Sequence, residues 1–151
     1  MANSMVKIDV HLIFHIKSTS VQMHYGDLPR IFAYIGGILN GYGSIPIIVG
    51  GISDHIHILT TLPKSMTLVE LVRNTKSNSS RWIKTISQIY STFAWQDGYG
   101  AFSVSPSILD KTINYIKNQE THHKKMSFSD EYKALLNAYR LQYDEKYLFN
   151  D

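Results

Sequence analysis

The chain has 151 residues, with 15 Lys and Arg against 12 Asp and Glu, a formal net charge of +3 and no cysteine. This length is typical of one domain and is enough to bury an ordinary hydrophobic core. The lack of cysteine excludes a disulfide scaffold, a thiolate zinc site and a cysteine nucleophile. With 44% hydrophobic and 18% charged residues, the composition is not that of a disordered chain.

No apolar run reaches the roughly 20 residues that a membrane-spanning helix needs. The first residues also lack the basic and apolar regions of a signal peptide. We therefore expect a cytoplasmic protein with no membrane contact, folded as a single domain over residues 1–151. The positive charge would suit nucleic acid, but the excess is small, and its distribution matters more than its total.

The first half of the chain predicts one strand, one helix and two further strands. Residues 8–16 alternate between an apolar side and a more polar side, which is the pattern of a half-buried strand. A helix is expected from about 28, where an N-cap candidate precedes a proline, to near 40. Two β-rich runs at 44–49 and 55–62 then indicate a hairpin or neighbouring strands.

The second half predicts helices around one further strand. The longest helical pattern spans 67–90, and residues 94–104 end in a strand. A helix is expected at about 107–125, and a C-terminal helix and tail at about 127–151. The order β-α-β-β-α-β predicts an α+β, ferredoxin-like fold, in which an antiparallel sheet carries helices on one face, plus C-terminal helices.

Two histidines in the third predicted strand are candidate metal ligands. His55 and His57 are two residues apart, so both imidazoles point to one face of the strand, roughly 6.5–7 Å apart along the chain. Two neighbouring imidazoles can bind one divalent metal if a third ligand comes from elsewhere. On this motif alone, a pair of structural histidines remains an open alternative.

A tyrosine and a glutamine are candidate partners of such a site. Tyr115 and Gln119 are four residues apart in the helix expected at 107–125, so they lie on one face of it. A tyrosine hydroxyl, with a pKa of about 10, is a weak nucleophile, but it can attack a phosphate that a metal polarises. The alternative is an ordinary half-buried ring with a solvated hydroxyl.

The helix at 67–90 carries basic residues together on one side, and no acidic residue lies between the first and the last of them. Cationic and amide donors without carboxylates suit a phosphate backbone, although a solvated helix face is the simpler alternative. These candidate DNA-binding residues are Arg73, Lys76, Arg81 and Lys84.

Four other histidines receive no role in the predicted site. His122 and His123 lie near a predicted helix end, where cations complement the helix dipole. His11 and His15 could lie near a metal, but a place on the surface of the first strand is the simpler expectation.

Taken together, these motifs resemble the small single-tyrosine HUH transposases of bacterial insertion sequences, whose relatives include the repeat-associated tyrosine transposases. The most specific match is the His-hydrophobic-His motif, followed further along by Tyr-x-x-x-Gln. The resemblance covers essentially the whole chain. The matching segments are 11–14, 54–59, 71–82, 95–104, 115–119 and 143–148.

The resemblance implies a divalent metal, normally Mg²⁺ or Mn²⁺, held by His55, His57 and Gln119, with Tyr115 as the nucleophile. Attack by Tyr115 on a DNA phosphate would leave a 5′-phosphotyrosine link and a free 3′-hydroxyl, and another 3′-hydroxyl would reverse the step. The implied substrate is single-stranded DNA with hairpins near insertion-sequence ends. The implied assembly is a homodimer in which the tyrosine helix of one subunit completes the other's site.

Two other functions stay open at this point. A ferredoxin-like protein that only binds DNA hairpins would need none of the four residues that the resemblance places in the site. A domesticated copy would keep the chemistry but act on chromosomal repeats instead of moving its own element. Because all four residues are present, the sequence favours the metal-dependent transposase.

Overall fold

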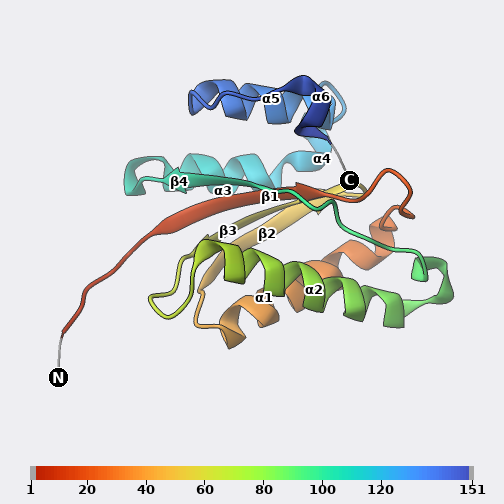
Figure 1. Cartoon of the computed structure of the whole chain (residues 1–151), viewed down its shortest axis with the longest axis horizontal. Coiled ribbons are helices and arrows are strands. Elements are labelled where there is room, and N and C mark those ends of the chain that lie inside the picture. The colour runs from red at the N-terminus through yellow and green to blue at the C-terminus, as the bar shows by residue number, and fades with distance from the viewer. Residues whose placement is uncertain (1–2, 150–151) are drawn as a thin grey trace.

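Four antiparallel strands form one sheet in the order β2-β3-β1-β4 (Figure 1). The computed structural model of the chain describes residues 3–149. The strands are β1 (Asp9–His15), β2 (Pro46–Ile52), β3 (His55–Thr61) and β4 (Gly100–Val104). β2 and β3 are consecutive and pair as a hairpin, and β1 lies between β3 and β4.

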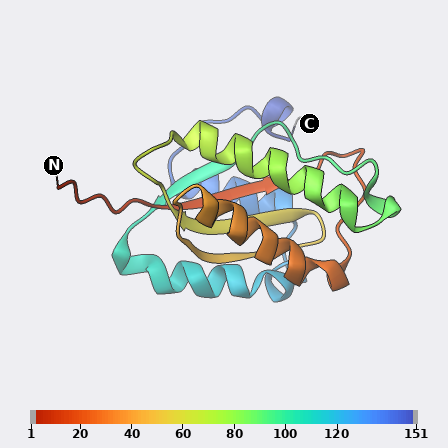
Figure 2. The same cartoon turned by 90° about the horizontal axis from the view of Figure 1, so that it is seen from below.

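Two long helices cover one face of the sheet, as Figure 2 shows. They are α1 (Leu28–Gly41) and α2 (Leu68–Ile86). α2 begins at a capping box, in which Thr67 and Glu70 each accept the other's backbone N–H. Apolar side chains of both helices pack on alternate residues of β1 and β3, and this layer forms the main core.

The C-terminal helices lie on the opposite face of the sheet (Figure 1). They are α3 (Leu109–Lys117), α4 (Gln119–His122), α5 (Phe128–Ala138) and α6 (Glu145–Leu148). Two smaller apolar clusters join them to the sheet, one under α3 and one under α5. Three short 3-10 helices complete the described elements: η1 (Tyr25–Asp27), η2 (Gln88–Tyr90) and η3 (Pro106–Ile108).

The α+β, ferredoxin-like fold expected from the sequence is confirmed. The alternation of β1 is also as expected, with Leu12 and Phe14 in the main core and Ile13 in the cluster under α5. However, β1 is buried on both faces, because the C-terminal helices cover the side that the sequence left exposed.

The helix expected at 107–125 is divided. α3 ends at Lys117, Asn118 takes φ −99° and ψ 22°, and α4 runs only to His122. At the break, the side-chain amide of Gln119 donates a hydrogen bond to the carbonyl oxygen of Tyr115 at 3.4 Å. A side-chain hydrogen bond to a backbone carbonyl oxygen therefore forms at the break between the two helices.

The helix expected at 67–90 also ends early. It stops at Ile86 because Ser87 is extended, with φ −164°, and its side chain caps η2. Within residues 3–149, no helix combines the length and the apolar character needed to cross a membrane.

α3 approaches the sheet closely at Gly50 in β2. A Cβ at this position would stand 2.7 Å from Ile116 Cγ2 and 2.9 Å from the Ile116 carbonyl oxygen. Only a glycine leaves room for the helix backbone here. The contact sets the distance between α3 and the sheet, and with it the position of Tyr115, the neighbour of Ile116.

Candidate active site

Two buried histidines of β3 form the base of the candidate site. His55 and His57 lie on the sheet face that the C-terminal helices cover, and both are 0% exposed. In the β1–β3 ladder, His57 is opposite Ile13 and His55 is opposite His15. The strand alternation thus places the two imidazoles side by side as predicted, with ring centroids 5.2 Å apart.

α3 and α4 bring the predicted tyrosine and glutamine to these rings. Gln119 is 1% exposed, and its Oε1 lies 3.0 Å from His55 Nε2. The Tyr115 ring centroid lies 5.7 Å from that of His57. One chain therefore brings together all four residues that the sequence motifs selected as nucleophile and metal ligands.

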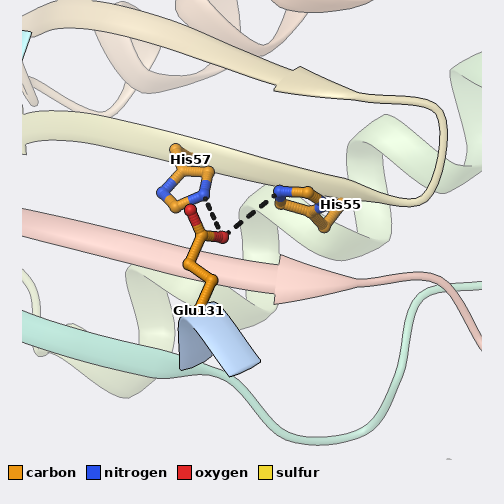
Figure 3. Close-up of side chains that lie close together, drawn as sticks. All are labelled: His55, His57 and Glu131. Carbon is orange, nitrogen blue, oxygen red and sulfur yellow. Dashed lines mark hydrogen bonds and ion pairs between the residues drawn. The ribbon is translucent and has the colours of Figure 1, made fainter. Parts of the chain in front are cut away.

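A carboxylate from α5 faces both imidazoles (Figure 3). Glu131 Oε1 is 3.2 Å from His57 Nε2 and 3.5 Å from His55 Nε2. Its other oxygen, Oε2, accepts hydrogen bonds from the Tyr115 hydroxyl and, at 3.0 Å, from the Gln119 side-chain amide. At 1% exposure, the carboxylate is inside the protein.

Glu131 was not among the residues selected from the sequence. It lies in the first turn of α5, behind the N-cap Ser127, where acidic residues are common because they complement the helix dipole. Nothing local distinguishes such a residue from one that is buried over a sheet. Its role follows from tertiary packing.

Three further histidines surround the same groups. His123 Nε2 lies 3.1 Å from Glu131 Oε1, and His122 Nε2 lies 3.4 Å from Oε2. His11 Nε2 lies 2.7 Å from His57 Nδ1, and His11 is 4% exposed. The expectation of a surface position for His11 is wrong, because α3 and α5 cover that side of β1.

The residue before the histidine pair determines which nitrogen of His55 donates. Asp54 Oδ1 lies 2.7 Å from His55 Nδ1. A carboxylate only accepts hydrogen bonds, so the ring donates from Nδ1. This contact fixes the ring with Nε2 toward the oxygens of Gln119 and Glu131. A carboxylate that orients an imidazole in this way is typical of metal-binding histidines.

Burial and hydrogen bonding set the protonation of the group. Burial lowers the pKa of His57 to about 4 and, with the neighbouring His57, that of His11 to about 3, so both rings are neutral at pH 7. Burial alone would raise the pKa of Glu131, but hydrogen bonds from His57, Tyr115 and Gln119 hold it below its usual range. Burial and the hydrogen bond to Glu131 raise the pKa of Tyr115, so its hydroxyl is protonated.

The donor atoms have the composition of a divalent metal site. One ligand atom from each of His55, His57 and Glu131 lies within 4.8 Å of the others, and Gln119 adds an amide oxygen. Imidazole nitrogens bind many divalent metals, while carboxylate and amide oxygens suit Mg²⁺ and Mn²⁺. Metal binding requires neutral imidazoles, which is the form of His57 at pH 7.

A small cavity gives access to the tyrosine. Its volume is about 190 Å³, and it lies at the outer side of the buried group. The Tyr115 ring is partly exposed, whereas His55 and His57 are not. The lining residues are Tyr115, His122, Met126, Glu131, Ala134 and Leu135.

The four basic residues selected for DNA binding lie away from this site. They belong to α2, which covers the other face of the sheet (Figure 2). Arg73, Arg81 and Lys84 are exposed. Lys76 instead donates hydrogen bonds to the carbonyl oxygens of Gln96, at 2.8 Å, and of the two residues after it.

Lys76 therefore holds the loop before β4 against α2. Between this loop and α2 lies a groove with a volume of about 480 Å³. Its lining combines basic and aromatic side chains, among them Arg73, Lys76, Trp95 and Tyr99.

Comparison with known proteins places the chain in a family. The family described as Transposase IS200 like matches residues 4–119, a stretch that contains the His55–His57 pair, Tyr115 and Gln119. The chain belongs to the IS200-like transposase family, which confirms the resemblance seen in the motifs. Glu131 lies beyond the matched residues.

Two solved structures share the fold. A candidate transposase from Deinococcus radiodurans R1 is 18% identical, with a TM-score of 0.61 over 79% of this chain and 95% of that one. A REP-associated tyrosine transposase bound to a REP hairpin is 12% identical, with a TM-score of 0.59 over 82% of this chain and 73% of that one. Among curated proteins there is no match.

Proposed function

We propose that this protein is a single-tyrosine HUH transposase, which cleaves and rejoins single-stranded DNA at hairpin-flanked insertion-sequence ends. Membership of the IS200-like family supports a DNA strand transferase in general. The finer proposal rests on one observation, the meeting of Tyr115 with His55, His57 and Gln119 around one buried carboxylate.

Each residue has a definite chemical role in this proposal. His55, His57 and Gln119 would hold Mg²⁺ or Mn²⁺, which supplies Lewis-acid polarisation of the scissile phosphate when bound. Tyr115 Oη forms a bond to phosphorus, and because this bond makes the hydroxyl far more acidic, its proton passes to Glu131 Oε2, which already accepts its hydrogen bond.

The phosphorus–O3′ bond breaks, and the electron pair leaves with the 3′-oxygen, which is then protonated. The products are a 5′-phosphotyrosine and a free 3′-hydroxyl. Attack by another 3′-hydroxyl reverses these steps and joins the strands. Because the phosphotyrosine link conserves the energy of the broken phosphodiester bond, the reaction needs no ATP.

The proposed partner is single-stranded DNA that carries hairpins. A structural neighbour is bound to a REP hairpin. In this chain, the exposed basic residues of α2 offer a surface for a phosphate backbone in addition to the candidate active site. A homodimer stays a prediction that follows from the resemblance, and a cytoplasmic location stays a prediction from the sequence. Tyr115 contacts the site of its own chain, so the sharing of sites between subunits that the resemblance implies is the alternative to a site completed within one chain.

Intact-protein mass spectrometry tests the proposal. The native chain is incubated with Mg²⁺ and single-stranded DNA from the flanks of its gene, beside Tyr115→Phe and Tyr147→Phe. Tyr147 is 60% exposed and serves as the control tyrosine. We expect a DNA-sized mass gain on the native chain and on Tyr147→Phe only. If no protein forms the adduct on DNA that it binds tightly, the binding-only function is the better explanation.

A further inference from the structure

We propose that Glu131 is a direct ligand of the divalent cation, through Oε1, and that α5 is therefore part of the metal centre. This inference rests on the proposed metal site of His55, His57 and Gln119. It adds a fourth protein ligand, and that ligand lies outside residues 4–119, the part of the chain that the family shares.

The carboxylate of Glu131 is buried among polar side chains. Glu131 is 1% exposed, and its described hydrogen bonds and ion pairs come from histidine, tyrosine and glutamine side chains. None of these groups is a lysine or an arginine. A divalent cation would therefore add the full positive charge that favours a buried carboxylate.

Two acceptor oxygens also face one imidazole nitrogen. Gln119 Oε1 and Glu131 Oε1 are acceptors only, and both face His55 Nε2, at 3.0 Å and 3.5 Å. His55 donates from Nδ1 to Asp54, which fixes the ring with Nε2 toward these two oxygens. Ligand atoms of β3, α4 and α5 therefore converge on one place, as they do in a metal site.

The distances between these atoms are also compatible with one metal ion. For metal–ligand bonds of about 2.1 Å, neighbouring donor atoms stand about 3.0 Å apart in an octahedron and about 3.4 Å apart in a tetrahedron. The separations here are 3.0 Å for His55 to Gln119, 3.2 Å for His57 to Glu131 and 3.5 Å for His55 to Glu131. Glu131 thus stands from the imidazoles at distances that suit hydrogen bonds in the metal-free protein and that a shared coordination shell could keep with little movement.

The orientation and the charge of Glu131 also suit a metal ligand. Oε2 is occupied by the Tyr115 hydroxyl and the Gln119 amide, which fixes the carboxylate with Oε1 toward the two imidazoles. Two imidazoles and an amide are neutral ligands, and the carboxylate supplies the negative oxygen that hard cations prefer. The same side chain then links the metal to the nucleophile.

Mn²⁺ binding without DNA tests this inference independently of activity. Binding is measured by electron paramagnetic resonance, and the rise of the melting temperature with Mn²⁺ provides a second readout. The variants are Glu131→Gln, Glu131→Asp, His57→Ala and, as the matched control, Asp130→Asn, the exposed neighbour on α5. We expect affinity to fall roughly tenfold or more for Glu131→Gln and His57→Ala, and to stay unchanged for Asp130→Asn.

Each outcome decides one of the two claims. If His57→Ala loses affinity while Glu131→Gln binds Mn²⁺ like the native chain, Glu131 is not a ligand and the proposed site stands. If neither variant changes binding, the metal lies elsewhere and both claims fail. Should Glu131→Gln fail to fold, Glu131→Asp carries the test, because its shorter side chain keeps the charge but withdraws the oxygen from the imidazoles. Native-like Mn²⁺ affinity in Glu131→Asp would overturn the inference.

Discussion

Gly50 lies directly beneath Ile116, so that a Cβ on the glycine would stand 2.9 Å from the isoleucine carbonyl oxygen. This contact joins β2, at the edge of the sheet, to the helix that carries the nucleophile. Tyr115 precedes Ile116, and its ring reaches across to His57 on the neighbouring strand. The geometry of the site therefore depends on a residue with no chemistry of its own.

Gly50→Ala should separate the tyrosine from the metal site. The added methyl group meets helix backbone, which cannot turn away as a side chain can, so α3 must shift. We expect a loss of about 1–3 kcal/mol in the free energy of unfolding, measured by urea denaturation, and slower adduct formation at a temperature where the variant is folded. Gly37→Ala, whose Cβ meets nothing within 4 Å, is the control. An unchanged rate of adduct formation in Gly50→Ala would show that the position of Tyr115 does not depend on this contact.

Much of the site was accessible from the sequence because its residues obey short-range periodicities. The period of two in β3 places His55 beside His57, and the spacing of four places Tyr115 near Gln119, even though the helix breaks at Asn118. These two periodicities belong to the strand and the helix themselves and do not depend on tertiary contacts.

The remainder depends on contacts between distant segments, which periodicity does not encode. Glu131 and His11 enter the site only because α5 and α3 cover the second face of the sheet. Likewise, Lys76 shares the basic side of α2, but the loop before β4 engages its ammonium group. Charge patterning alone cannot separate a lysine that holds a loop from one that binds phosphate.

Asp54→Ala should weaken metal binding without removing a ligand. The Asp54 carboxylate accepts the Nδ1 proton of His55, so its loss leaves the ring free to rotate and to change tautomer. We expect Mn²⁺ affinity to fall about 10–100-fold in calorimetric titrations. Asp54→Asn, which keeps an oxygen acceptor, should lose less. Asp97→Asn, at a side chain that is 80% exposed, is the control. Equal Mn²⁺ affinities of Asp54→Ala and the native chain would show that Asp54 does not support metal binding.

The basic residues of α2 should divide into two classes on mutation. Arg81→Ala and Arg73→Ala remove exposed charges, so we expect weaker binding of single-stranded DNA, a salt dependence reduced by about one unit of slope and an unchanged melting temperature. Lys76→Ala removes the donor to the carbonyl oxygens of the loop before β4, so we expect a lower melting temperature. DNA affinity that is insensitive to both arginines would place the DNA elsewhere on the protein.

Mixing two inactive variants should reveal which subunit supplies the tyrosine. In Tyr115→Phe the metal ligands are intact, and in His57→Ala the nucleophile is intact. The structure places Tyr115 in the site of its own chain, where its hydroxyl donates to Glu131. With both residues in one chain, no mixture contains a complete site. We therefore expect the mixed proteins to form no covalent DNA adduct by mass spectrometry, even after joint refolding.

An adduct on the His57→Ala chain in the mixture would mean that its tyrosine reaches the metal site of a partner. That result would establish the shared-site homodimer that the family resemblance implies. The site formed within one chain would then belong to the protein outside the dimer.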